Sequence, residues 1–161
     1  MLRKGPIARR RRSMAGFTLA ELVMVASVLA ILATVTLPIA KFAAKRSKEA
    51  DLRLALREMR MAVDEYKRYS EAGLIPVDIG TEGYPKKLDI LVEGVPIVGQ
   101  VDKKLKLLRR IPIDPMTGKD EWGLRSYQDA FDATSWGGEN VYDVYSLSKG
   151  TGLNGVAYRK W

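Results

Sequence analysis

The sequence predicts an α+β protein in which one long N-terminal helix carries a small antiparallel β-sheet on its second half. Three observations predict this fold class. The first is a run of nineteen uncharged residues, Leu22 to Ala40. The second is a regular apolar stripe that follows this run, and the third is a set of short C-terminal segments rich in aromatic and β-branched residues. The first half of such a helix suits a membrane, and the second half suits a soluble core.

The apolar run is long enough to span a bilayer. As a helix, residues 17–40 would extend about 36 Å, whereas the hydrocarbon core is about 30 Å thick. Pro38 removes the hydrogen bond to the carbonyl of Thr34 and predicts a kink at that point. An ordinary secretory signal has a shorter apolar region than this one. Pro38-Ile39-Ala40 nevertheless resembles a weak cleavage site, so a cut near Ala40 is an alternative.

The charge of the chain is unevenly distributed. The formal net charge is +8, and six of the 27 basic residues lie in residues 1–16, which contain no acid. The rest of the chain therefore has 21 basic and 19 acidic residues. A basic tail beside an apolar helix is typical of a cytoplasmic flank, whereas a nucleic-acid-binding protein needs a basic surface on its folded part. We predict a targeting segment at 1–16, starting at Met1 or Met14, and no nucleic-acid partner.

Glu21 lies one helical turn inside the apolar segment. A charge at the centre of a membrane helix costs about 2.5–3.5 kcal/mol, so a buried Glu21 would need a cation as partner. A cut after Gly16 would create one, because the new α-amino group of Phe17 is protonated at neutral pH. We predict that Glu21 forms such a pair, and the alternative is that its side chain reaches outward to the membrane interface.

The second half of the helix has an apolar stripe with spacings of four and three. Its members are Leu52, Leu56, Met59, Val63 and Tyr66. This spacing places the five side chains on one helix face, which we expect to form the core. Gly73 and Pro76 predict that the helix ends near Ser70.

Short elements are expected after the long helix. Turn residues and apolar runs predict a short helix at 86–92, a loop at 95–100, another helical turn at 105–108 and a turn-rich link at 111–118. Aromatic and β-branched residues predict strands at 122–127 and 141–147, with Gly137-Gly138 in the turn between them. A third short strand is expected at 155–158.

The N-terminal motif resembles a known processing site. The run Gly16-Phe17-Thr18-Leu19-Ala20-Glu21-Leu22 follows a basic leader and precedes an apolar stretch that ends at Pro38. It is similar to the cleavage and methylation motif of type IV pilins and type II secretion pseudopilins. The resemblance implies that a prepilin peptidase cuts between Gly16 and Phe17 and methylates Phe17, and that Phe17 and Glu21 act in assembly. It also implies a pilin-like fold with three parts: a leader (1–16), a transmembrane and fibre-core helix half (17–40) and a periplasmic head (41–161).

Motifs in the head resemble the major pseudopilins of type II secretion. They are Gly83-Tyr84-Pro85, Pro112-Ile113-Asp114-Pro115-Met116-Thr117-Gly118, Trp122 and Tyr142-Asp143-Val144-Tyr145-Ser146. The resemblance implies a structural subunit of a pseudopilus that helps export folded proteins. Its partners would be further copies of the chain, minor pseudopilins, the prepilin peptidase, an inner-membrane assembly platform and membrane lipid. The chain would cross the bacterial inner membrane once and later enter a periplasm-spanning fibre. A type IV pilus subunit in adhesion, motility or DNA uptake is the alternative.

One segment departs from that family. Its members usually carry calcium-binding aspartates in the loop after the second strand, whereas residues 146–155 contain no acid and one lysine. Asp143 is the nearest carboxylate, and strand alternation leaves open whether it faces this loop. We expect no metal and no other cofactor, with calcium as the alternative, and we predict that hydroxyl, amide and backbone hydrogen bonds close the loop.

The composition also limits the enzymatic possibilities. The chain has no cysteine and no histidine, which excludes a disulfide framework, thiol chemistry, a histidine-based triad and a histidine or cysteine zinc site. The carboxylate pairs Asp129/Asp132 and Asp114/Asp120 have no accompanying pocket signal, so we predict that the protein is not an enzyme. A binding protein released by a cut near Ala40 is a further interpretation, which the N-terminal mass would decide.

Overall fold

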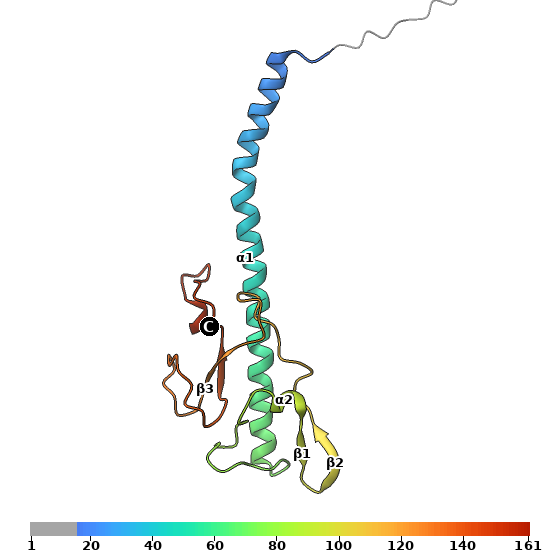
Figure 1. Ribbon diagram of the computed structural model, residues 1–161, viewed down its shortest axis with the longest axis vertical. Helices are drawn as coiled ribbons and strands as arrows, with labels where there is room; N and C mark the ends of the chain where they lie inside the picture. Colours follow the sequence, from blue (N-terminus) through green and yellow to red (C-terminus); the bar gives the residue numbers. More distant parts are fainter. Residues whose placement is uncertain (1–15) are drawn as a thin grey trace, which may run out of the picture. The chain divides into compact units, whose positions relative to one another are not determined.

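The computed structural model describes residues 16–161, apart from the side chains at positions 35, 37 and 101. Most of the leader and the choice between Met1 and Met14 lie outside the described residues. The chain divides between Lys41 and Phe42 into two compact units, and helix α1 (Leu19–Glu71) contributes to both (Figure 1). A long N-terminal helix followed by small antiparallel sheets confirms the α+β class.

Both ends of α1 have recognisable caps. Thr18 precedes the helix, and its Oγ1 accepts the N–H of Glu21 at 3.2 Å, which is the first of the two bonds of a Thr-x-x-Glu capping box. At the other end, Gly73 has φ +67°, and the N–H groups of Gly73 and Leu74 donate to the carbonyls of Ser70 and Tyr69. This Schellman arrangement ends the helix close to the predicted position. The predicted start at Phe17 is two residues too early, because Thr18 caps the helix.

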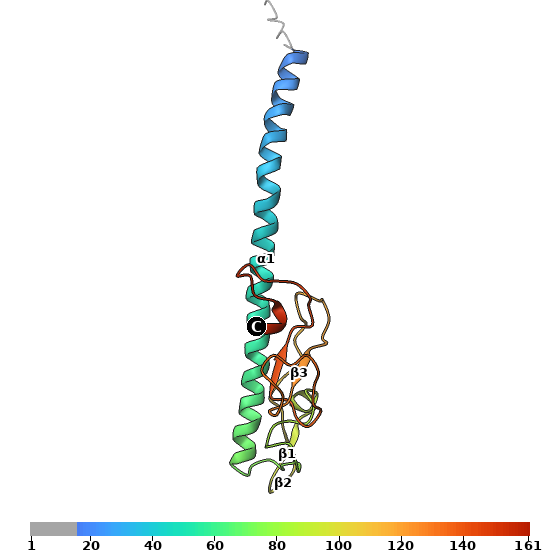
Figure 2. The same cartoon turned by 90° about the vertical axis from the view of Figure 1, so that its left-hand side faces the viewer.

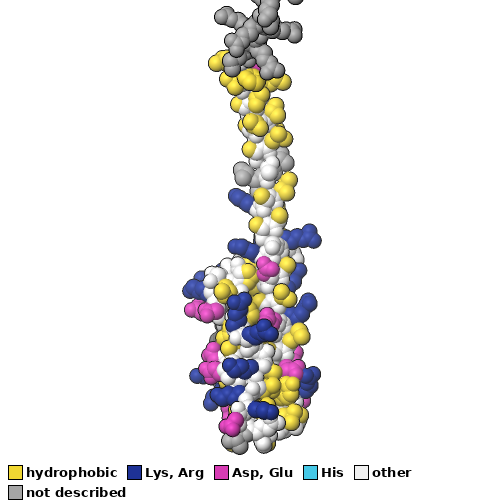
Figure 3. Space-filling view, turned by 90° about the vertical axis from the view of Figure 1, so that its right-hand side faces the viewer, with side chains coloured by type: hydrophobic (Ala, Val, Ile, Leu, Met, Phe, Trp, Pro, Cys, Tyr) yellow, Lys and Arg dark blue, Asp and Glu magenta, His cyan; other side chains and the backbone are white. Residues whose placement is uncertain are grey.

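In the first unit, α1 is apolar on all sides. Its described side chains from Leu19 to Ala40 are exposed, and hydrophobic groups cover most of the face seen in Figure 3. This stretch is long and apolar enough to cross a membrane, which is consistent with a single-pass membrane protein. The helix continues through Pro38, and the kink expected there stays a prediction. The hydroxyls of Thr34 and Thr36 donate to carbonyls of the preceding turn, so neither is left unsatisfied.

In the second unit, the core forms on the predicted stripe of α1. All five stripe residues are buried, from Leu52 to Tyr66. The core is completed by apolar side chains from the rest of the unit: Ile75, Leu88, Leu91, Val95, Leu108, Trp122, Val141, Val144 and Tyr158. The stripe predicted from spacing alone is therefore confirmed as the core face of the helix.

Two separate antiparallel sheets replace the single sheet that was predicted. Strands β3 (Gly123–Arg125) and β4 (Asp143–Tyr145) pair with Leu124 opposite Val144, at the places where strands were expected. Strands β1 (Val95–Ile97) and β2 (Gln100–Leu105) form a hairpin of their own. Figures 1 and 2 show this hairpin near the C-terminal end of α1.

The hairpin corrects two predictions. The loop expected at 95–100 is wrong, because Pro96 lies in a two-stranded ribbon where its missing donor is tolerated, and Gly99 turns with φ +79°. The helical turn expected at 105–108 is also wrong. Leu105 ends β2, and the N–H groups of Leu107 and Leu108 donate to the carbonyl of Leu91.

Two further elements differ from expectation in extent. The short helix α2 spans only Ile90–Glu93 and is closed by Gly94. The third strand expected at 155–158 is reduced to one bridge between Thr151 and Ala157, followed by the 3-10 helix η1 (Tyr158–Lys160). The C-terminal segment instead hydrogen-bonds to α1 through side chains.

Candidate functional site

The predicted processing residues lie at the start of the first unit. Gly16 and Phe17 precede the helix, and Phe17 is 75% exposed. A side chain built on Gly16 would meet no atom within 4 Å. Glu21 is exposed in the first turn of α1, and Pro38 lies inside the helix. Cleavage after Gly16, methylation of Phe17 and pairing of Phe17 with Glu21 stay predictions.

Glu21 also has a local environment that spacing alone did not reveal. Its backbone N–H is capped by Thr18, and its carboxylate lies in the first turn of a 53-residue helix. Negative charge is favourable there because the unpaired N–H groups carry partial positive charge. Glu21 therefore has a single-chain role at the helix start, separate from any role in assembly, and an experiment must distinguish the two.

Hydroxyls help to close the loop at 146–155, as predicted, but charged side chains from outside the loop also bind it, which was not predicted. Ser146 donates its hydroxyl to Oδ2 of Asp114 at 2.6 Å and accepts the N–H of Ser148 at 3.1 Å. The Ser148 hydroxyl in turn accepts the N–H of Gly150 at 3.3 Å. Asp114 is fully buried and also accepts the N–H of Met116 at 2.7 Å. One buried carboxylate thus holds the turn before β3 and the loop after β4 together.

Two charged side chains of α1 tie the same loop to the helix within the second unit. Lys45 donates to the carbonyl of Thr151 at 2.7 Å. Oε1 of Glu49 accepts the N–H of Leu153 at 2.8 Å and the hydroxyl of Tyr158 at 3.0 Å. Glu49 is only 4% exposed, so these bonds replace water at a buried carboxylate. The C-terminal segment accordingly runs beside α1 in Figure 2.

Sequence reasoning missed Glu49, although the sequence contained a signal. Glu49 lies three residues before Leu52 and so continues the spacing of the apolar stripe. A carboxylate at such a position is expected to face the core and to need hydrogen-bond donors there. The donors come from more than a hundred residues away along the chain, which is why the stripe alone could not identify them.

Burial and the hydrogen bond to Glu49 raise the pKa of the Tyr158 hydroxyl to about 12. A phenol whose pKa is higher in the folded state stabilises the fold below its unfolded pKa of about 10, and this contribution is lost as pH rises toward 12. We expect Tyr158→Phe to flatten the fall in unfolding free energy between pH 10 and 12. Denaturant titrations of both chains at each pH measure the difference, and parallel pH curves would contradict the prediction.

Asp143 forms an ion-pair cluster with two arginines. Its Oδ1 accepts Nε of Arg60 at 2.7 Å, and its Oδ2 accepts Nη1 of Arg125 at 3.1 Å. Arg125 has a side chain only 7% exposed and also donates to the carbonyls of Ala133 and Arg159, both at 3.0 Å. The orientation of Asp143 that the sequence left open is therefore toward these arginines. Among the described residues, no three acidic, histidine or cysteine side chains form a metal cluster.

Asp129, another carboxylate singled out in the sequence, shapes a turn. Oδ2 of Asp129 accepts the N–H groups of Ser126 at 2.7 Å and Gly137 at 3.1 Å. These two bonds, the first being the stronger cause, keep the pKa of Asp129 below its usual value. Asp129 thus stabilises its own loop, as Asp114 stabilises the loop at 146–155.

Comparisons of the chain with protein-family models, with curated proteins and with solved structures find no match.

Proposed function

We propose that the protein is a structural, fibre-forming subunit, and specifically a pseudopilus subunit that helps export folded proteins through a type II secretion system. One observation carries the proposal: a single 53-residue helix has an exposed apolar first half and a second half whose stripe is buried in a folded head. The motif Gly16-Phe17 before the helix and Glu21 in its first turn supply a processing site and a charge partner.

In this mechanism, packing of the apolar half of α1 supplies most of the free energy of fibre assembly. Its exposed side chains would first face lipid and then pack against the same helix half of neighbouring subunits. In the fibre, tight packing replaces lipid contacts, and outside lipid each buried Å² of apolar surface contributes about 25 cal/mol. The heads lie outside the fibre core, so the folded second unit and the fibre-forming helix half have separate roles.

The pair between the Phe17 amine and Glu21 of a neighbour sets the register. Two unit charges 4 Å apart attract by about 4 kcal/mol at an effective dielectric of 20, before the cost of removing water from both groups. Because that cost offsets much of the attraction, the pair contributes more to alignment than to affinity. Subunits without the cut lack the cation, so processing and assembly are coupled.

The N-terminal mass of the chain purified from membranes tests the proposal. We expect a chain that begins at Phe17 and carries one methyl group on its amine. A chain that begins after Ala40 would overturn the proposal, because the fibre-forming helix half would be gone.

Deletion of the gene distinguishes the proposed role in secretion from the alternative role in a type IV pilus. In a deletion strain, we expect proteins that normally leave the cell to accumulate, folded, in the periplasm, while surface pili and motility are unchanged. Loss of surface pili with normal protein export would contradict the secretion role and favour the type IV pilus.

A further inference from the structure

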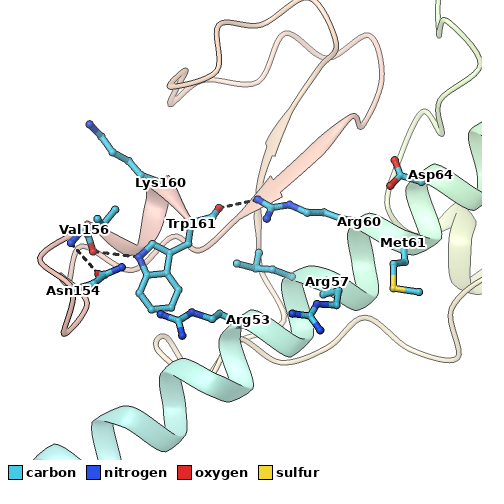
Figure 4. Close-up of a pocket in the computed structure, with 10 residues that line it drawn as sticks. Arg53, Arg57, Arg60, Met61, Asp64, Asn154, Val156, Lys160 and Trp161 are labelled. Carbon is cyan, nitrogen blue, oxygen red and sulfur yellow. Dashed lines mark hydrogen bonds between the residues drawn. The ribbon is translucent and has the colours of Figure 1, made fainter.

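A basic groove lies on the second unit, between α1 and the C-terminal segment. It has a volume of about 610 Å³, and four cationic side chains and one carboxylate line it together with the indole of Trp161. These charged residues are Arg53, Arg57, Arg60, Lys160 and Asp64. Figure 4 shows the arginines of α1 and the indole converging from the two sides. We call this surface the basic groove.

Three of the four cationic side chains in the groove form no salt bridge within the described part of the chain. Arg60 is bonded to Asp143 and to the main-chain oxygen of Trp161. Arg53 lies 4.5 Å from the centre of the Trp161 ring. Among the salt bridges of the described residues, none involves Arg53, Arg57 or Lys160. The indole is held in place by its bond to the carbonyl of Val156 at 3.3 Å. The groove therefore presents the guanidinium groups of Arg53 and Arg57, neither of them in a salt bridge, beside a hydrogen-bonded aromatic ring.

The same head carries a surface of the opposite charge. The segment 126–142 between β3 and β4 contains three acids, Asp129, Asp132 and Glu139, and no lysine or arginine. Phe131, next to Asp132, is 89% exposed. We call this segment the acidic loop. An aromatic side chain of this size offers a large apolar contact area to a partner.

The acidic loop is held in one conformation although it contains no helix or strand. Asp129 binds the backbone at Ser126 and Gly137, as described above. Tyr145 donates its hydroxyl to the carbonyl of Thr134 at 3.2 Å, and the indole of Trp136 donates to the carbonyl of Asn140 at 2.7 Å. Because the loop is ordered before binding, docking Phe131 and Asp132 would cost little conformational entropy.

We propose that the basic groove of one subunit receives the acidic loop of the next copy of the same chain. Phe131 enters beside Trp161 and Arg53, where an aromatic ring gains contacts with both the indole and the guanidinium group. Asp132 meets Arg57. The inference rests on the proposed fibre function, and it identifies the contact that joins neighbouring heads.

A second copy is the occupant that the charges favour. Each head has one groove and one loop, built from different residues, so every copy can donate to one neighbour and accept from another. Such a heterologous contact passes from copy to copy, and where its rotation does not close into a ring it builds an open filament, as a fibre requires. The contact is also expected to weaken as salt is raised, because its charges lie at the surface.

Cysteine crosslinking tests the contact in the full chain. The protein has no cysteine, so Arg57→Cys and Asp132→Cys each introduce a single thiol. When the two variants carry different tags and are expressed together, oxidation of isolated fibres can join them only between subunits. We expect a mixed dimer at least tenfold above the control pair Arg57→Cys with Lys119→Cys, since Lys119 lies outside both surfaces and is exposed.

Charge reversal provides the second readout. Arg57→Glu and Asp132→Lys should each lower fibre yield several-fold, and the chain carrying both should recover most of it, because the pair is restored with opposite polarity. Two outcomes would overturn this inference alone: fibres in which Arg57→Cys and Asp132→Cys chains form no mixed dimer, or an Arg57→Cys chain that crosslinks to a different protein instead. A wild-type chain that is cut after Ala40 and forms no fibre would instead overturn the proposed function.

Discussion

Glu21→Ala is expected to abolish fibre formation while leaving membrane insertion and cleavage after Gly16 intact. The substitution removes the only carboxylate in the apolar segment, so the amine of an incoming Phe17 has no partner on its neighbour. Insertion depends on the apolar run, which Ala preserves. Fibres counted by electron microscopy after overproduction and the N-terminal mass of the membrane-bound chain give the two readouts.

Two further variants separate pairing from helix capping. Glu21→Gln keeps the size of the side chain and a residue that suits the third position of a capping box, but removes the charge. Thr18→Ala removes the cap that Thr18 provides to Glu21 and costs about 1 kcal/mol of helix stability, but keeps the charge. We expect Glu21→Gln chains, like Glu21→Ala chains, to form no fibres. We expect Thr18→Ala chains to assemble. Normal fibres from Glu21→Gln would contradict the role of the charge pair.

Asp143→Ala is expected to destabilise the second unit by about 3 kcal/mol. The substitution leaves the buried guanidinium of Arg125 without its carboxylate, and removing one partner of a buried ion pair costs about 3–5 kcal/mol. We expect the lower end of this range because the Asp143 side chain is 24% exposed. Denaturant unfolding of the full chain in detergent measures the loss by fluorescence, since all three tryptophans lie in the second unit.

Glu121→Ala is the matched control for this measurement. Its carboxylate also pairs with a cation, Lys119, but at 3.7 Å and with both side chains about two thirds exposed. Such surface pairs contribute at most about 1 kcal/mol. Asp143→Asn keeps an acceptor for one arginine. Its loss of unfolding free energy should therefore fall between the losses for Asp143→Ala and Glu121→Ala. If Asp143→Ala were no more destabilising than Glu121→Ala, the cluster would not stabilise the head.

The sequence was sufficient to predict elements whose pattern extends over many residues. Helix α1 was predicted to within two residues at either end, because its apolar run, its stripe and Gly73 are all local signals. Strands β3 and β4 were placed correctly, although each is shorter than expected. The predicted site residues Gly16, Phe17 and Glu21 rest on a contiguous motif, and the structure shows only where they lie.

Short segments were predicted less well, because their partners decide their conformation. Val95 to Gln100 contains Pro96 and Gly99, which locally indicate a loop, yet pairing with residues up to Leu105 makes it a hairpin. The segment 105–108 has a helical composition, but the N–H groups of Leu107 and Leu108 donate to the carbonyl of Leu91 and not to a carbonyl within the segment, so no helical turn forms. A run of three or four residues has too little local preference to resist such contacts.

The sequence by itself determined the long helix, its division into an exposed apolar half and a core-forming half, and the α+β class, since each depends on spacing within one segment. Only the tertiary structure decided what holds the C-terminal region in place. Glu49 bonds to Leu153 and Tyr158, and Asp143 turns toward Arg60 and Arg125. The partners in both clusters are separated along the chain, in most cases by more than eighty residues. A buried charge must find its partner in space, and no local pattern specifies which distant residue that will be.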